Sequence, residues 1–147
     1  MSAASNYLEN AVLDFWLKNN SGTYSSPATV YVALFTSDDS TGATGENLEA
    51  GTLTNEVSTS GTGYARQSVT FGTITNGVVS NSGNVTFPTA LTNWGTITHV
   101  AVMDANSTDD SAGAGNVLFY GALTTAREIL IDDTFQITAT NLQITLA

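Results

Sequence analysis

Cysteine is absent from the 147 residues, and basic side chains are almost absent. Without cysteine the chain can form no disulfide, no thiolate metal site and no cysteine nucleophile, so its stability must come from packing or assembly. Only Lys18, Arg66 and Arg127 are basic, against thirteen acidic residues, and the formal net charge is −10. Three cations cannot neutralise a run of phosphates, so nucleic acid and anionic membrane surfaces are poor partners.

Long hydrophobic runs are also missing, and the start of the chain is not typical of a secretion signal. No stretch approaches the roughly 18 consecutive apolar residues of a membrane-spanning helix. The first twenty residues lack a basic segment and carry Glu9 and Asp14 within their apolar stretch. We therefore expect a soluble protein that is made in a cytoplasm and has no membrane partner.

The residues that are present describe one folded domain. Hydrophobic residues make up 41% of the chain and charged residues 11%, a balance that argues against disorder. Apolar residues recur at spacings of three and four between Asn6 and Lys18, which predicts a helix whose first turn is capped by Asn6 together with Glu9. We predict a helix and connector over residues 1–27 and a β-sandwich over residues 28–147.

From Ala28 onward the period changes to two, and β-branched and aromatic residues predominate. Gly72–Ser80 and Arg127–Ile131 are two shorter candidate strands, and the main predicted strands are Thr29–Thr36, Tyr64–Phe71, Asn84–Pro88, Thr96–Asp104, Asn116–Leu123, Thr134–Thr140 and Leu142–Ala147. We predict an all-β fold, a jelly-roll-like antiparallel β-sandwich of about seven to nine strands with one N-terminal α-helix. The irregular stretch Ser37–Gly63 is long for a compact domain, so we expect it to be functional or ordered by a neighbour.

His99 is the only histidine and therefore the first residue to suspect of acid–base chemistry. Strand alternation places it on one face with Ile97, Ala101 and Met103. A catalytic imidazole needs a pocket, a nucleophile within reach and an orienting carboxylate, and the chain has no G-x-S-x-G nucleophile motif. We interpret His99 as a packed or interface residue that is hydrogen-bonded to a neighbour.

The segment DANSTDD resembles the beginning of a calcium-binding loop. It places oxygen-bearing side chains at alternate positions, namely Asp104, Asn106, Thr108 and Asp110. The glycine and the closing glutamate of such a loop are both missing. We interpret the segment as a solvated acidic turn, and we interpret Asp38 and Asp39 in the same way.

No other group of residues indicates catalysis. A glycosidase needs two carboxylates at a set separation, and Glu46, Glu49 and Glu56 lie in the irregular stretch without an aromatic cluster around them. The glycines between residues 61 and 72 flank a predicted strand without opening a helix, so they are turn glycines and not a phosphate-binding loop. We predict that the protein is not an enzyme and has no catalytic residue, no metal and no cofactor.

The predicted helix carries an apolar surface formed by Tyr7, Phe15 and Trp16. Such a helix can pack on the open end or face of its own sheet, or it can dock on another subunit. The sequence leaves both alternatives open.

Three short motifs are similar to those of a known protein family. They are GYARQ-x-VTFG at Gly63–Gly72, WG-x-ITH at Trp94–His99 and LFYG-x-LT at Leu118–Thr124. With them the chain resembles, from Tyr7 to its end, a family of small tailed-bacteriophage virion proteins usually labelled phage tail fibre proteins. Where the family pattern has Gly-Asp, this chain has Asp132-Asp133, and we expect an altered turn within an intact fold.

The resemblance implies a virion structural component that is made in the host bacterial cytoplasm. Small β-sandwich proteins also decorate phage capsids, and we favour a capsid decoration or cement protein, a dimer or trimer that bridges major capsid protein or other virion subunits and stabilises the assembled shell. The alternative is a tail fibre or tail-associated adaptor with a surface for host glycans. In both cases we expect Leu8, Phe15, Trp16 and the Ser37–Gly63 stretch to contact other subunits.

Overall fold

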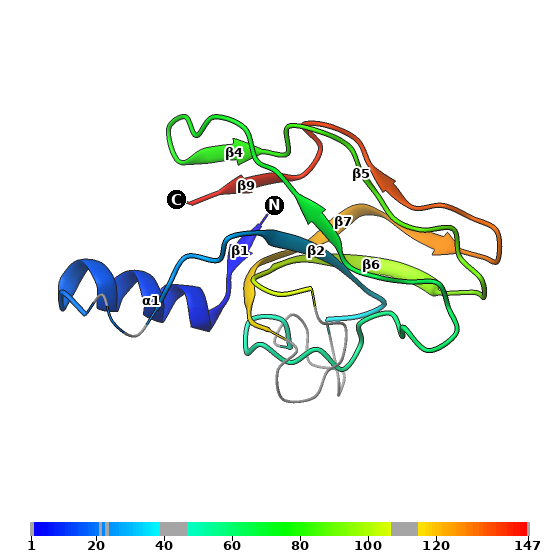
Figure 1. The fold of residues 1–147 in the computed structure, drawn as a ribbon, viewed down its shortest axis with the longest axis horizontal. Helices are drawn as coiled ribbons and strands as arrows, with labels where there is room; N and C mark the ends of the chain where they lie inside the picture. Colours follow the sequence, from blue (N-terminus) through cyan, green and yellow to red (C-terminus); the bar gives the residue numbers. More distant parts are fainter. Residues whose placement is uncertain (1, 21, 23, 39–46, 107–114, 147) are drawn as a thin grey trace.

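The computed structural model describes residues 2–20, 22, 24–38, 47–106 and 115–146 (Figure 1). Within these residues one α-helix and nine β-strands follow one another: β1 (Ala3–Ala4), α1 (Asn6–Leu17), β2 (Val30–Phe35), β3 (Gln67–Val69), β4 (Val78–Ser80), β5 (Val85–Thr86), β6 (Gly95–Met103), β7 (Val117–Ile129), β8 (Gln136–Ile137) and β9 (Gln143–Thr145). The predicted all-β fold with one N-terminal helix is confirmed.

Five strands form an antiparallel sheet in the order β1-β7-β6-β2-β3. At its centre β2 pairs with β6 from Tyr31 opposite Met103 to Phe35 opposite His99. The last four residues of β2 are buried, so both faces of this strand are covered. A strand covered on both faces needs apolar residues throughout, which explains the sequence VYVALF.

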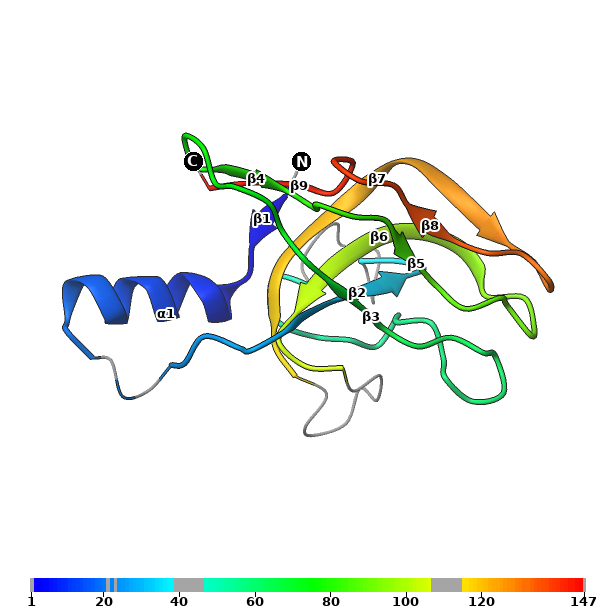
Figure 2. The ribbon, with the colours of Figure 1, turned by 45° about the horizontal axis from the view of Figure 1, so that its top comes forward.

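Two antiparallel ribbons, β4-β9 and β5-β8, lie over one face of this sheet (Figure 2). The main core fills the space between the two layers and has an aromatic centre in which Tyr64 contacts Phe87 and Trp94, with ring centroids 6.0 and 5.5 Å apart. This is the predicted antiparallel sandwich. Its jelly-roll variant is not confirmed, because one five-stranded sheet faces two separate ribbons.

The opposite face of the large sheet is covered by part of the stretch predicted as irregular. Leu48 and Leu53 form a second apolar cluster with Phe35 and Met103. The Val57 backbone N–H donates to the Leu34 carbonyl at 3.0 Å, which fixes this segment on β2. Of the two expectations for this stretch, that it is functional or that a neighbour orders it, the second is wrong for residues 47–63, because their own chain holds them. Residues 39–46 lie outside the described part.

Strand β7 unites two segments that were predicted as separate strands, Asn116–Leu123 and Arg127–Ile131. The join has an irregular register, because Ile97 is paired with Arg127 whereas His99 is paired with Ala122. The β-branched Thr124 and Thr125 continue the extended conformation across this join. The residues between the two pairings therefore bulge from the ladder while the strand continues.

The same irregularity corrects the predicted faces of β6. Ile97 lies in the main core with Val100 and Val102, whereas Ala101 and Met103 lie in the second cluster. Strict alternation predicts Ile97 on the face of Ala101, and a register shift between Ile97 and His99 is the reason for the difference. A one-residue slip moves a side chain to the other face of a sheet.

Two further boundaries differ from the predictions for local reasons. The helix cap is Ser5 and not Asn6, since the Ser5 side chain accepts a hydrogen bond from the Leu8 backbone N–H at 3.3 Å. The segment Gly72–Ser80 is not one strand. Asn76 and Gly77 adopt left-handed conformations (φ 52° and 75°) in a tight turn, and only the residues after the turn form β4.

Candidate interaction site: a projecting helical arm and an open cleft

Helix α1 is tied to the sheet at its first residue and extends away from the sheets (Figures 1 and 2). Ser5 is fully buried, its backbone N–H donates to the Leu118 carbonyl at 3.0 Å, and its hydroxyl donates to the Val117 carbonyl. The Asn6 backbone N–H donates to the Glu49 carbonyl at 3.0 Å. These bonds fix the direction in which the helix, hereafter the α1 arm (Asn6–Leu17), leaves the body.

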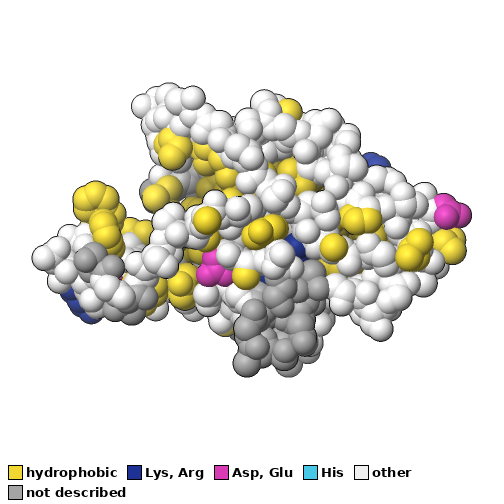
Figure 3. All heavy atoms as spheres, in the orientation of Figure 1, with side chains coloured by type: hydrophobic (Ala, Val, Ile, Leu, Met, Phe, Trp, Pro, Cys, Tyr) yellow, Lys and Arg dark blue, Asp and Glu magenta, His cyan; other side chains and the backbone are white. Residues whose placement is uncertain are grey.

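Beyond its base the α1 arm is left largely uncovered by the rest of the described chain. No residue of the helix is buried, and Trp16 and Leu17 are 75% and 77% exposed. Phe15 packs edge-on against Trp16 at 5.4 Å and is itself half exposed. Apolar side chains of the arm stand clear of the body in Figure 3. Of the two predicted alternatives, packing on the chain's own sheet is therefore wrong for the outer part of the helix.

Leu8, one of the predicted contact residues, differs from Phe15 and Trp16. It lies in the first turn and is half-buried. Tyr7 beside it is also half-buried, and its ring centroid lies 5.5 Å from that of Tyr24. Leu13 and Leu17 are more exposed than Leu8, although the predicted apolar stripe did not include them. That these residues touch another subunit stays a prediction.

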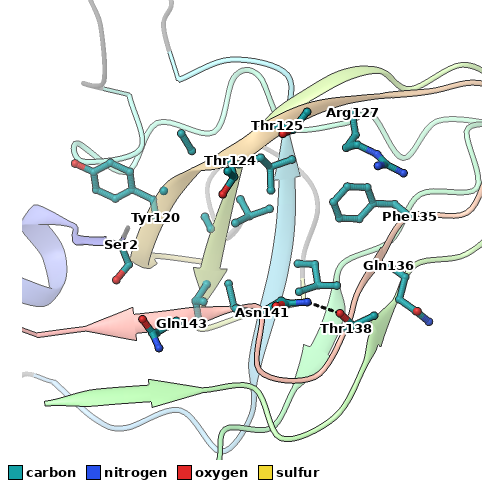
Figure 4. Close-up of a pocket in the computed structure, with 18 of the residues that line it drawn as sticks. Ser2, Tyr120, Thr124, Thr125, Arg127, Phe135, Gln136, Thr138, Asn141 and Gln143 are labelled. Atoms are coloured by element: carbon teal, nitrogen blue, oxygen red, sulfur yellow. Dashed lines mark hydrogen bonds between the residues drawn. The ribbon is translucent and has the colours of Figure 1, made fainter. Parts of the chain in front are cut away.

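A cleft of about 430 Å³ opens between β7 and the strands β8 and β9 (Figure 4). Core side chains form its apolar lining, among them Val100, Val102, Leu123, Phe135, Ile137 and Ile144. Neutral polar side chains add to the lining, among them Thr124, Thr125, Gln136, Thr138, Asn141 and Gln143. The lining contains no histidine and no carboxylate, so the cleft as described has no general base or metal ligand of these kinds.

The cleft exists because three strands have unpaired edges on this side. In the described part of the chain, β7 pairs on its outer edge with β1 only, at Tyr120 and Phe119, while β8 pairs only with β5 and β9 only with β4. At one end of the cleft the Thr145 backbone N–H donates to the Ser2 hydroxyl at 3.1 Å. The short strand β1 therefore closes one end of the gap and leaves the remainder open.

Arg127 is the one basic residue at the cleft, and its side chain lies beside Phe135 in Figure 4. Lys18 is bound to Asp14 at 3.0 Å and Arg66 to Glu56 at 2.7 Å, whereas Arg127 forms no ion pair among the described residues. Arg127 is exposed, so the cleft offers a positive charge in a protein of strongly negative net charge.

Two side chains of the motif GYARQ, Tyr64 and Arg66, belong to a buried polar network. Arg66 Nε and Nη2 donate to Glu56 at 2.8 and 2.7 Å, and the Tyr64 hydroxyl donates to Glu56 at 2.9 Å. Burial, together with the negative charge of Glu56, raises the pKa of Tyr64 well above its usual value. The carboxylate of Glu56, considered above as a glycosidase candidate, is thus a structural acceptor for both side chains.

His99 is half-buried within β6, and its Nδ1 lies 2.9 Å from the hydroxyl of Thr98. The predicted hydrogen bond to a neighbour is confirmed. His99 does not line the cleft.

Asp104 closes the base of the DANSTDD segment. Its two carboxylate oxygens accept hydrogen bonds from the Asn116 backbone and side-chain N–H groups, at 2.6 and 2.8 Å. Asp38 is buried and accepts a hydrogen bond from the Leu48 backbone N–H at 2.7 Å, so its interpretation as a solvated turn residue is wrong.

The other candidate positions at Asp39, Glu46, Thr108 and Asp110 lie outside the described residues. Among the residues described, no cluster of three metal-ligating side chains occurs.

The fold and these surfaces define an all-β protein with a projecting helical arm. A comparison with known families identifies the family to which it belongs. The chain belongs to the family Gp80, described as podophage GP4 fiber I protein gp80, whose model matches residues 3–145. The predicted resemblance to phage tail fibre proteins is confirmed, and the protein is a structural component of a bacteriophage virion. No curated protein matches the chain. Across the described residues, no helix is long and apolar enough to span a membrane.

Proposed function

We propose that the protein is a non-enzymatic subunit of the phage tail fibre, or of the tail region that carries the fibre, and that its α1 arm joins it to a neighbouring subunit. The observation that carries this proposal is a helix that displays its largest apolar side chains in a chain matched over residues 3–145 by a fibre family. Large apolar surfaces left exposed on a soluble protein are typical of interaction sites.

The mechanism is burial of apolar surface at a subunit contact. Trp16 and Phe15 are aromatic anchors of the kind that dominate binding energies, and Leu13 and Leu17 extend the same surface. Removing an anchor of this kind typically weakens an interface by 2 kcal/mol or more, which corresponds to about thirtyfold in affinity.

Capsid decoration, the function favoured from the sequence, fits the same sandwich and the same arm. The family description nevertheless names a fibre protein, and it supports the tail alternative better. The chain contains no long repetitive or coiled-coil segment of the kind that builds a fibre shaft, so we place it at an attachment point or tip. A surface for host glycans belongs to the same alternative and stays a prediction.

The test is the copy number of the protein in purified virions, measured by quantitative mass spectrometry against the major capsid protein. A small number of copies, together with antibody labelling at the tail in electron micrographs, is the expected result. Hundreds of copies in simple ratio to the capsid protein would overturn the proposal and establish capsid decoration.

A second experiment tests the arm. Trp16→Ala should reduce incorporation into virions at least tenfold without lowering the melting temperature of the purified protein, because the side chain is 75% exposed. Ile74→Ala is the matched control, since Ile74 is 72% exposed but lies far from the arm in sequence, near β4. Equal incorporation of the two variants would exclude the arm as a contact.

A further inference from the structure

The described residues leave two surfaces uncovered, the apolar outer part of the α1 arm and the cleft between β7 and β8–β9. They are close along the chain, because Ser2 lines the cleft while Asn6 begins the arm. The arm nevertheless cannot fold back onto its own cleft. The hydrogen bonds of Ser5 and Asn6 hold its base, and from there the helix extends away from the sheets (Figures 1 and 2).

The cleft has the properties of a site that another element covers. Its floor is formed by core side chains such as Val100, Val102 and Ile144, which are buried, and its rim by exposed side chains such as Arg127, Gln136 and Gln143. The outer edge of β7 beyond Tyr120 has no strand partner among the described residues. An open strand edge promotes association unless another element covers it.

Resting on the proposed function of the α1 arm, we infer that the arm of one copy covers the cleft of a second copy. The occupant of the cleft is thus a helix with an apolar face, supplied by the same chain. An exchange of identical elements between protomers closes both surfaces at once and gives a closed symmetric assembly.

Charge and area favour this occupant. Arg127, which forms no ion pair within the described part of the chain, carries a positive charge at the cleft. The arm carries a negative charge at Glu9, while its second carboxylate, Asp14, is paired with Lys18. The exposed side chains of the arm offer on the order of 400–500 Å² of apolar surface. Two reciprocal contacts, counted on both partners, would then bury roughly 1,200–1,400 Å², at the lower end of the range of specific interfaces.

The absence of cysteine makes a clean cross-linking test possible. One preparation carries Leu17→Cys on the arm, and a second carries Gln143→Cys at the cleft. Both residues are exposed, so neither substitution disturbs the core. After mixing under conditions that allow subunit exchange and mild oxidation, a disulfide between the two preparations can arise only between different copies. Ser60→Cys, an exposed position on a loop outside the cleft lining, replaces Gln143→Cys in the control.

The expected result is a cross-linked product with Gln143→Cys at least tenfold more abundant than with Ser60→Cys. In addition, light scattering should give a multiple of the monomer mass for the unmodified protein. The double variant Trp16→Ser with Leu17→Ser should have the mass of a monomer. Asn10→Ala, an exposed polar position on the same helix, should keep the oligomer mass.

Three outcomes would overturn the inference. A Leu17–Leu17 disulfide without cross-linking to Gln143 would mean that the arms pair with each other. A monomeric protein whose arm variants still fail to enter virions would mean that another virion protein receives the arm, and the proposed function would stand. An oligomer whose cleft binds oligosaccharide and is unaffected by the arm variants would assign the cleft to a glycan.

Discussion

Removal of the Glu56 carboxylate is the most informative test of how the segment before β3 is held on the large sheet. Its oxygens accept three hydrogen bonds, two from Arg66 and one from the Tyr64 hydroxyl, and the two side chains of the ion pair are 3% and 0% exposed. Glu56→Ala leaves the Arg66 guanidinium buried without its counter-charge. Breaking a buried pair from one side costs about 3–5 kcal/mol, a large part of a total stability of about 5–15 kcal/mol.

The assay is urea unfolding at constant protein concentration in a Trp16→Phe background, so that the tryptophan fluorescence comes from Trp94, whose ring lies 5.5 Å from that of Tyr64. The double variant Glu56→Leu with Arg66→Met should be more stable than Glu56→Ala, because apolar residues can replace a buried pair at little cost. Glu49→Ala is the control. The Glu49 carboxylate is half-buried and accepts a hydrogen bond from Tyr120 at 3.4 Å, so this substitution should lower the free energy of unfolding by less than about 1 kcal/mol. A loss below about 1 kcal/mol in Glu56→Ala would refute the reasoning.

Three further predictions concern single side chains. Since burial raises the pKa of Tyr64, stability should be complete below its unfolded value of about 10 and should fall as the pH rises above it; Tyr64→Phe should flatten this fall in melting curves between about pH 8 and 11. Asp104→Ala removes both hydrogen bonds to Asn116 and should cost about 1–3 kcal/mol in urea unfolding, whereas an unchanged midpoint would mean that these bonds contribute nothing. Asp132 has φ 69°, so Asp132→Gly should raise stability by up to about 1 kcal/mol, and a lower melting temperature would contradict the strain argument.

The turn at Asp132 departs from the family pattern, and its conformation shows what the departure costs. The sequence predicted an altered turn within an intact fold where the family pattern has glycine. The structure places Asp132 in the left-handed region, with its backbone N–H donating to the Ala90 carbonyl at 2.8 Å. The neighbouring Asp133 carboxylate accepts from the Leu130 N–H at 2.9 Å. The turn therefore keeps its hydrogen bonds, and the cost of the substitution is confined to the backbone of one residue.

The sequence by itself determined the elements whose signal is local. The stripe of apolar residues fixed the helix to within one residue of Asn6–Leu17, and the run VYVALF identified the central strand β2. The three motifs identified the family, and the absence of a nucleophile motif together with a single histidine argued against an enzyme. These inferences depend on residue type and spacing alone, which tertiary contacts do not alter.

Only the tertiary structure decided what depends on residues far apart in the chain. Glu56 and Arg66 meet as a buried pair, and the described part of the long irregular stretch covers the second face of the sheet instead of needing a neighbour. The exposure of the α1 arm and the position of the cleft follow from which strand edges are paired. Strand pairing is set by backbone hydrogen bonds between distant segments, and an apolar stripe is the same in a sequence whether its own chain covers it or leaves it for another.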